Sequence, residues 1–225
     1  GYIIDIDNTV KPIFGHQEGA ELGYNPQKPG RPSHNYHTFF IGRARITLGV
    51  DVLPGKQHTG ACGMARLWSF LDAIPPNRWP FLLRGDVGYG NDNIMSEVEA
   101  RGLTYLFKIK RMGMAQELFA YLADDNQWKP CGCGWEAHEH HLKLSSWKLA
   151  RRLVFIRRPM VKGHPGIPLE QESLPAPEGA KAEKVPRQQV FEFAKDKHGR
   201  EWDYCILVTN DTSMDATALS QLYRD

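Results

Sequence analysis

Two aspartates, Asp7 and Asp86, stand at the ends of similar apolar segments. Residues 2–10 are rich in β-branched side chains and lack a helical period, which predicts a buried strand with Asp5 and Asp7 on one face. Residues 81–90 again predict a strand that ends in an acid and is followed by glycines. Carboxylates are costly on a core strand unless they are paired or bind a metal ion. We therefore expect Asp7 and Asp86 to lie on adjacent parallel strands and form a divalent-metal site, although both acids capping loops is the simpler alternative.

The composition is that of an ordinary globular protein. Of the 225 residues, 41% are hydrophobic and 24% charged, enough for one large domain or for a core with an insertion. No apolar run approaches the roughly 18 residues that a membrane helix needs. There is no signal peptide, because the sequence starts inside a predicted strand, and this start predicts that an upstream part is missing. The formal net charge of +2 permits nucleic-acid binding without arguing for it.

The cysteines and histidines leave a zinc site open as a minor alternative. Cys131 and Cys133 are separated by one residue, not by the two to four residues usual between zinc ligands. Residues 136–144 are better explained as a partly polar strand, and the four cysteines as reduced thiols of a cytosolic protein. The residues concerned are Cys62, Cys131, Cys133, Cys205, His138, His140 and His141.

The order of predicted elements indicates the fold. After the first strand, the Gly- and Pro-rich residues 11–33 form a loop too long for an ordinary turn, so we expect it to be functional. An antiparallel hairpin, a helix that Thr59 can cap, the strand of Asp86, a helix capped by Asn91 or Asp92, and a further strand follow. This order predicts an α/β, RNase H-like mixed sheet with flanking helices for residues 1–128. The two hairpin strands are expected at residues 34–41 and 45–53. The last strand is expected at residues 103–109, and a short helix at residues 114–122.

The pattern changes after Trp128 from alternating helices and strands to strands alone. Residues 129–205 are therefore predicted to be a β-rich insertion, distinct from the first sheet, with a flexible loop near residues 159–189. Residues 206–225 are expected to return to the core and to begin a last helix, capped by Asp211 or Ser213.

Six motifs together resemble the DDE transposases of bacterial insertion sequences, most closely the IS1380 group of the IS4-like set. The resemblance spans nearly the whole chain. It implies that Asp7 and Asp86 are the first two catalytic acids, and that Thr9, Asn91 and Tyr223 are motif residues. The third acid, a Glu that follows the family's Tyr, would lie beyond Asp225. The motifs are Asp7-Asn-Thr-Val-Lys-Pro, Gly15-His-Gln-Glu-Gly-Ala, Gly23-Tyr-Asn-Pro, Lys28-Pro-Gly-Arg-Pro-Ser-His34, Arg84-Gly-Asp-Val-Gly-Tyr-Gly-Asn91 and Leu222-Tyr-Arg-Asp225.

The resemblance also implies a mechanism and partners. Two Mg²⁺ ions, for which Mn²⁺ can substitute, would lie roughly 4 Å apart between the acids and support DNA cleavage and strand transfer. Asp7 would bridge both ions and Asp86 would hold one, whereas Asp5 is expected to be structural or in the second shell. The partners would be insertion-sequence ends and target DNA, bound by a dimer in the synaptic complex. The location would be the nucleoid in the bacterial cytoplasm, without a membrane.

Basic residues are candidates for contacts with DNA phosphates, although a solvated surface charge is the favoured explanation for each residue by itself. The arginines around residues 151–158 are the strongest group, because they cluster on one predicted strand. The full set is Lys11, Lys28, Arg31, His34, Lys108, Lys110, Arg111, Arg151, Arg152, Arg157 and Arg158.

Two alternatives remain. The chain is either an active transposase fragment or an inactive, decayed remnant that at most binds DNA. A more remote alternative is a phosphatase similar to haloacid dehalogenases, in which Asp5 would be the nucleophile and Asp7 the general acid/base. Those enzymes continue from the first strand into a helix and a parallel sheet, whereas a loop and a hairpin are predicted here.

Overall fold

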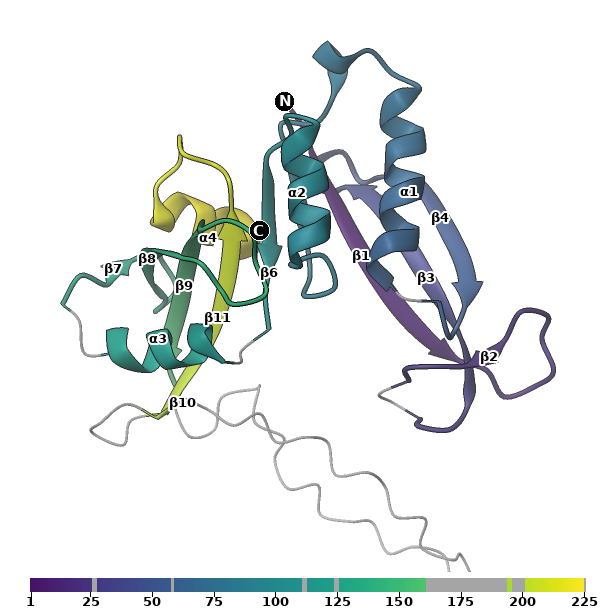
Figure 1. Ribbon diagram of the computed structural model, residues 1–225, viewed down its shortest axis with the longest axis horizontal. Coiled ribbons are helices and arrows are strands. Elements are labelled where there is room, and N and C mark those ends of the chain that lie inside the picture. Colours follow the sequence, from purple (N-terminus) through teal and green to yellow (C-terminus); the bar gives the residue numbers. More distant parts are fainter. Residues whose placement is uncertain are drawn as a thin grey trace, which may run out of the picture.

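A computed structural model describes residues 1–25, 28–57, 59–110, 113–123, 126–160, 194–195 and 201–224. Its strands form one sheet of eleven strands, counted over these described residues, in the order β2-β3-β1-β5-β6-β11-β9-β8-β7 (Figure 1). Strand β4 pairs with β3, and β10 pairs with β11. The strands are β1 (Ile3–Pro12), β2 (Glu21–Leu22), β3 (Pro32–Ile41), β4 (Ile46–Pro54), β5 (Leu82–Gly85), β6 (Tyr105–Lys108), β7 (Lys129–Pro130), β8 (Glu136–Leu142), β9 (Arg151–Pro159), β10 (Ala194–Lys195) and β11 (Glu201–Thr209).

The first part of the sheet has the predicted order. Strand β1 pairs antiparallel with β3, which forms a hairpin with β4, and parallel with β5, which pairs parallel with β6. The hairpin turns through a short 3₁₀ helix, Gly42–Ala44, and Arg45 in the left-handed region at φ 54°. Strand, hairpin, helix, strand, helix and strand follow one another as an RNase H-like domain requires.

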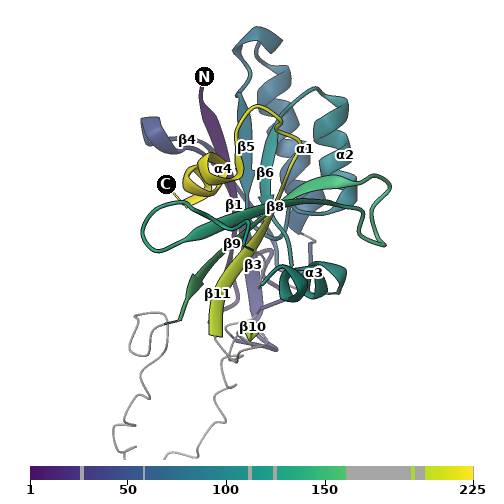
Figure 2. The same ribbon diagram turned by 90° about the vertical axis from the view of Figure 1, so that its left-hand side faces the viewer.

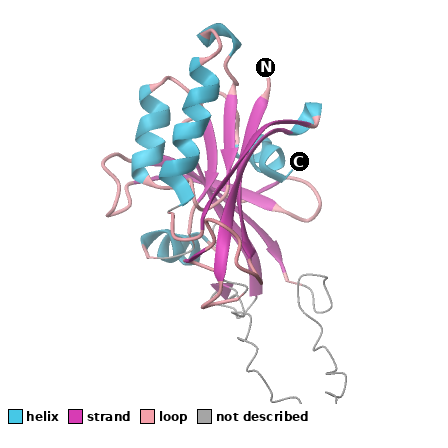
Figure 3. Cartoon of the chain, turned by 90° about the vertical axis from the view of Figure 1, so that its right-hand side faces the viewer, coloured by secondary structure: helices cyan, strands magenta, loops and turns pink. Residues whose placement is uncertain are grey.

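The helices lie on both faces of the sheet. Helices α1 (Thr59–Asp72), α2 (Asp92–Ala100) and α3 (Met114–Leu122) lie on one face, and α4 (Ala216–Arg224) lies on the other (Figures 2 and 3). The larger core, under α1 to α3, contains Ile4 and Ile6 of β1, and the smaller core, under α4, contains Leu82 of β5. Because neighbouring residues of a strand point to opposite faces, Asp5 and Asp7 face the side of α4.

Local signals fix the ends of α2. Asn91 caps it, because its Oδ1 accepts a hydrogen bond from the backbone N–H of Ile94 at 3.2 Å. This selects Asn91 from the two predicted caps. Gly102, at φ +70°, follows the C-terminus in a conformation that glycine adopts without steric cost.

The segment after Trp128 corrects one expectation. It is β-rich in its described residues, but β11 pairs antiparallel with β6, through Leu207 and Lys108. The strands that were expected to be distinct therefore extend the first sheet, because the exposed edge of β6 is completed by β11. Strand β11 also crosses the expected boundary at residue 205. Residues 161–193, which include most of the predicted flexible loop, lie outside the described residues.

The cap of α4 is also different from the prediction. Asp215 accepts a hydrogen bond from the backbone N–H of Ala218 at 2.7 Å and so caps the helix. Asp211 instead closes the preceding turn by accepting hydrogen bonds from the backbone N–H groups of Ser213 and Met214. In the described part of the chain, no helix is long and apolar enough to span a membrane.

Candidate active site

Asp7 and Asp86 lie at the same level of the sheet, at the edge where β5 ends. Strands β1 and β5 are adjacent and parallel, with Ile6 paired with Gly85, so each acid stands one residue beyond this pair. Both side chains are exposed. The hydroxyl of Thr9 donates a hydrogen bond to Asp7 Oδ2 at 3.1 Å, which restrains that carboxylate. Strands β1 and β5 are thus adjacent and parallel as predicted, with Asp86 directly after β5, and Thr9 has a structural role beside the first acid.

A buried tyrosine, Tyr89, and a partly buried one, Tyr223, lie within electrostatic reach of the carboxylates. Burial, followed by the negative charges of Asp7 and Asp86, raises the pKa of Tyr89 far above its ordinary value. The pKa of Tyr223 is also raised, first by burial and then by Cys205 and Asp86, with a smaller contribution from Asp7. Both phenols therefore stay protonated, and Tyr223 of α4 lies within electrostatic reach of the same two acids.

A buried histidine supports the loop that carries Asp86. His37 of β3 is fully buried, and its Nδ1 lies 3.5 Å from the hydroxyl oxygen of Tyr89. Burial lowers the pKa of His37, despite opposing contributions from Asp51 and Asp7, so the ring is neutral near pH 7. A Cβ on Gly63 of α1 would stand 2.7 Å from His37 Nδ1, which shows how closely the helix packs here.

Asp5 has a structural partner. It forms an ion pair with Arg84, the residue beside it in β5, with Arg84 Nε 2.5 Å from Asp5 Oδ1. This agrees with the expectation of a structural or second-shell role.

Three predicted phosphate contacts lie around the two acids. Lys11 is exposed on β1, four residues beyond Asp7 and on the same face of the strand. Lys108 of β6 follows Phe107, which pairs with Gly85, so Asp7, Asp86 and Lys108 occupy one level across three parallel strands. Lys110 is exposed two residues further on.

Two more predicted cations lie on the long loop. The Arg31 guanidinium carbon lies 4.7 Å from the centre of the Phe14 ring, and Lys28 Nζ lies 5.7 Å from it. Phe14 itself is 68% exposed, so the cations and the ring share an open surface. Arg111 lies outside the described residues.

The basic strand β9 contradicts its predicted role as the main DNA contact. Arg151 is 5% exposed and is ion-paired with Asp92 and Glu99. Arg157 is 6% exposed, is ion-paired with Glu136 and stacks on Trp128 and Trp202. These guanidiniums are committed to the protein interior, where phosphates cannot reach them.

The other members of the basic strand are also engaged. Arg152 pairs with Glu139 and donates hydrogen bonds to backbone carbonyls of the segment that leads to α4. Arg158 pairs with Asp203 at 3.2 Å. His34 belongs to the same correction, because it is buried at 8% exposure, with Nε2 3.1 Å from the carbonyl oxygen of Glu18. The sequence showed their positive charge but not the distant residues that neutralise or bury it.

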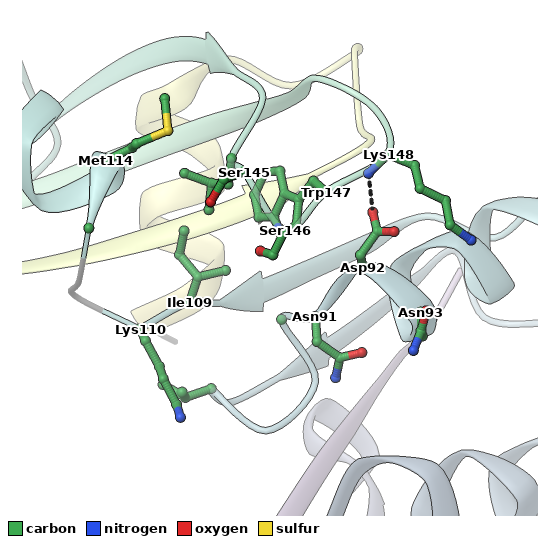
Figure 4. Close-up of a pocket in the computed structure, with 14 residues that line it drawn as sticks. Asn91, Asp92, Asn93, Ile109, Lys110, Met114, Ser145, Ser146, Trp147 and Lys148 are labelled. Carbon is green, nitrogen blue, oxygen red and sulfur yellow. Dashed lines mark hydrogen bonds between the residues drawn. The ribbon is translucent and has the colours of Figure 1, made fainter.

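A cleft of about 770 Å³ (Figure 4) has Val87, the residue that follows Asp86 in the sequence, in its lining. Its wall includes the start of α2, Lys110 and the loop of residues 144–148, and Lys148 points along its rim (Figure 4). Asp92 is held there by the backbone N–H of Lys148 at 3.1 Å. The cleft therefore offers polar groups and two lysines beside the acid-bearing edge, while Asp7 and Asp86 are outside its lining.

The donor set fits part of a magnesium site. Two exposed carboxylates supply the oxygen ligands that hard cations require. In the ranges that the structure describes, no three His, Cys, Asp or Glu side chains come together as a metal-binding group. The same finding disfavours the zinc alternative among these residues, since Cys131 is buried against Ser220 while Cys133 is exposed.

Sequence reasoning did not assign roles to His37, Tyr89 or Arg84. Tyr89 and Arg84 were inside a motif, but their partners come from distant elements. One signal was available for Arg84: it precedes Asp86 by two residues, as Asp5 precedes Asp7, so the two would share a face and a level. His37 gave no signal, because an isolated histidine on a strand is usually structural.

The fold and this edge define an RNase H-like domain that presents two carboxylates from neighbouring parallel strands. The sequence model of the transposase DDE domain matches residues 1–225, and the chain belongs to this family. The haloacid-dehalogenase alternative is wrong, because β1 is followed by an antiparallel hairpin in place of a helix and a parallel strand.

Among solved structures, the chain is similar to a piggyBac transposase synaptic complex with hairpin DNA, determined by cryo-EM, with a TM-score of 0.49 and 10% sequence identity. The similarity covers 100% of this chain and 37% of that one, so the chain spans little more than a third of its length. No curated protein matches the chain.

Proposed function

We propose that this chain is the catalytic domain of a bacterial DNA transposase of the IS1380 group, which cleaves and joins DNA strands at insertion-sequence ends. The observation that carries the proposal is the position of Asp7 and Asp86, one residue beyond the pair of Ile6 and Gly85 on adjacent parallel strands. Membership of the transposase DDE family supports phosphodiester chemistry at these two acids. The sequence motifs around both acids support the assignment to the IS1380 group.

The chain's own residues would hold the metal ions and orient the reacting groups. Asp7 and Asp86 are the ligands, and the hydrogen bond from Thr9 restricts the rotation of Asp7. Bound Mg²⁺ or Mn²⁺ supplies a Lewis acid for phosphodiester chemistry. Tyr223 remains a neutral phenol next to the acids, so it can donate a hydrogen bond without adding negative charge.

DNA would approach the same edge through its phosphates. Lys108 stands beside Asp86 and Lys11 beyond Asp7, while Lys110 and Lys148 line the adjoining cleft. These lysines offset the repulsion between phosphates and the two carboxylates. Synapsis of two DNA ends would require a dimer.

The test is nicking of a supercoiled plasmid that carries the ends of the element. Residues 1–225 should bind DNA at low salt and cleave little in Mg²⁺ or Mn²⁺, since no third potential metal ligand joins Asp7 and Asp86 among the described residues. A longer protein that supplies a third acid should nick the plasmid, and Asp7→Ala or Asp86→Ala should abolish this activity. Metal-dependent nicking by residues 1–225 that is lost in Asp7→Ala would instead place the third acid within this chain.

A DNA-binding remnant without catalysis is the second candidate, and it is supported by the finding that no three potential metal ligands cluster among the described residues. It predicts that the longer protein binds DNA and still fails to nick. The plasmid assay with both proteins separates the two candidates.

A further inference from the structure

Arg84 and Asp5 form a forked ion pair on the face of the sheet that carries the acids. Arg84 Nε donates to Asp5 Oδ1 at 2.5 Å, and Nη2 donates to Asp5 Oδ2 at 3.1 Å. The residues are neighbours on β5 and β1, two positions before Asp86 and Asp7 respectively. A guanidinium that meets both oxygens of a carboxylate is fixed in orientation, whereas a lysine ammonium has no such planar fork.

The same guanidinium reaches α4. Arg84 Nη1 donates to the carbonyl oxygen of Leu222, 138 residues further along the chain. Leu222 lies in α4, one residue before Tyr223. Arg84 therefore connects the two acid-bearing strands to the C-terminal turn of α4.

This connection determines what stands next to the carboxylates. Tyr223 follows Leu222 and lies within electrostatic reach of Asp86 and Asp7. We propose that Asp5 and Arg84 act as a positioning pair that holds the C-terminal turn of α4 beside Asp7 and Asp86. The catalytic meaning of this position rests on the proposed function, whereas the docking of α4 does not.

Gly42 gives an independent indication that the pair is closely packed. A Cβ at this position would stand 2.8 Å from Asp5 Oδ2 and 3.8 Å from Arg84 Nη2. Gly42 begins the turn between β3 and β4, so that turn closes over the carboxylate. Gly42→Ala should therefore displace Asp5 without changing its chemistry.

Hydrogen–deuterium exchange of α4 tests the pair in residues 1–225. In Asp5→Asn and Arg84→Lys, exchange within residues 216–224 should accelerate by about tenfold or more, because a charge-assisted contact is lost locally. Exchange in α2 should stay at the wild-type rate. Arg84→Lys keeps the charge, so its failure to rescue would assign the effect to the fork. Wild-type exchange of α4 in this variant would overturn the proposal.

Two further variants keep the test decisive. Gly42→Ala should produce a smaller acceleration of hydrogen–deuterium exchange in α4. If Asp5→Asn or Arg84→Lys fails to fold, Gly42→Ala takes its place as the test. Asp72→Asn is the matched control, because Asp72 is a 57% exposed partner of Arg101 away from α4. Equal acceleration in α2 and α4 would show general destabilisation and would contradict a positioning role.

A Mn²⁺ titration of the same proteins separates this proposal from the proposed function. Wild-type protein should bind Mn²⁺, and Asp5→Asn should change the affinity far less than Asp7→Asn does, since Asp5 is not a ligand. Absence of Mn²⁺ binding to the wild type would contradict the metal site while leaving the exchange result valid. Unchanged α4 exchange with intact Mn²⁺ binding would contradict the positioning pair alone.

Discussion

The basic strand β9 and the acidic edge formed by β1 and β5 are both clusters of like charge, yet the fold treats them in opposite ways. Arg151, Arg152, Arg157 and Arg158 each have an acidic partner, and two of them are buried. Asp7 and Asp86 are exposed, and neither forms an ion pair with a described residue.

The difference shows how a structural charge is distinguished from a functional one. Arg151 joins β9 to α2, whereas the other three arginines pair with acids on the neighbouring strands β8 and β11. The two aspartates have no such ion-pair partner among the described residues and are open to solvent. A cationic ligand can reach the exposed acids, whereas the buried arginines of β9 are closed to an anionic one.

The strongest test of this contrast is Arg151→Ala. It should lower the free energy of unfolding by about 3–5 kcal/mol, because Asp92 and Glu99 lose a partner whose side chain is 4% exposed. Urea denaturation at pH 7 measures the loss. Lys56→Ala removes an exposed partner of Glu21 and should cost about 0–1 kcal/mol. Similar costs for the two variants would mean that β9 is a solvated surface after all.

The acidic edge should respond in the other direction. Asp7→Asn or Asp86→Asn should weaken Mn²⁺ binding by about tenfold or more, because ligand charge and number set the affinity for hard cations. Folding stability should be unchanged or slightly higher, since one of two neighbouring negative charges is removed. Calorimetric titration and urea denaturation give the two values. A variant that lost stability without losing Mn²⁺ would make these acids structural.

Acid pH should weaken the contacts of β9. Burial raises the pKa of Asp92, but hydrogen bonds from Arg151 and from the Lys148 backbone outweigh it, so the net pKa is below its ordinary value. This contribution to stability is present above the unfolded pKa of about 3.9 and is lost as pH falls through the lower folded value. Below about pH 4, wild-type protein should therefore lose stability more steeply than Asp92→Asn. Parallel curves from denaturation at several pH values would contradict this role for Asp92.

The smallest effects concern DNA. Lys11→Ala and Lys108→Ala should each weaken DNA binding several-fold and reduce the slope of log affinity against log salt by about one. Arg158→Ala should leave the slope unchanged, because Arg158 is paired with Asp203. Lys143→Ala, at an exposed position after β8, is the matched control. Fluorescence anisotropy over a salt series measures the slopes, and a larger change for Arg158 would restore β9 as the DNA contact.

Local sequence was sufficient for the strand that bears each acid, for the hairpin and for the capped helix α2. These elements depend on side-chain alternation, a turn and an Asn91 cap, all of which act within a few residues. The adjacency of Asp7 and Asp86 also followed, because the order of elements restricts how the strands can pair.

Only the tertiary structure decided which charges are neutralised and where the sheet ends. Arg151 meets acids 52 and 59 residues earlier in the chain, and Arg84 meets Leu222 from the other end of it. Strand β11 joins β6 by the same kind of long-range pairing. Side-chain type and spacing encode backbone conformation over short distances, whereas the partner of a charge depends on packing between segments that are remote in sequence. The sequence therefore determined the acids and their strands, and the fold determined that these acids, and not the arginines, remain available to a ligand.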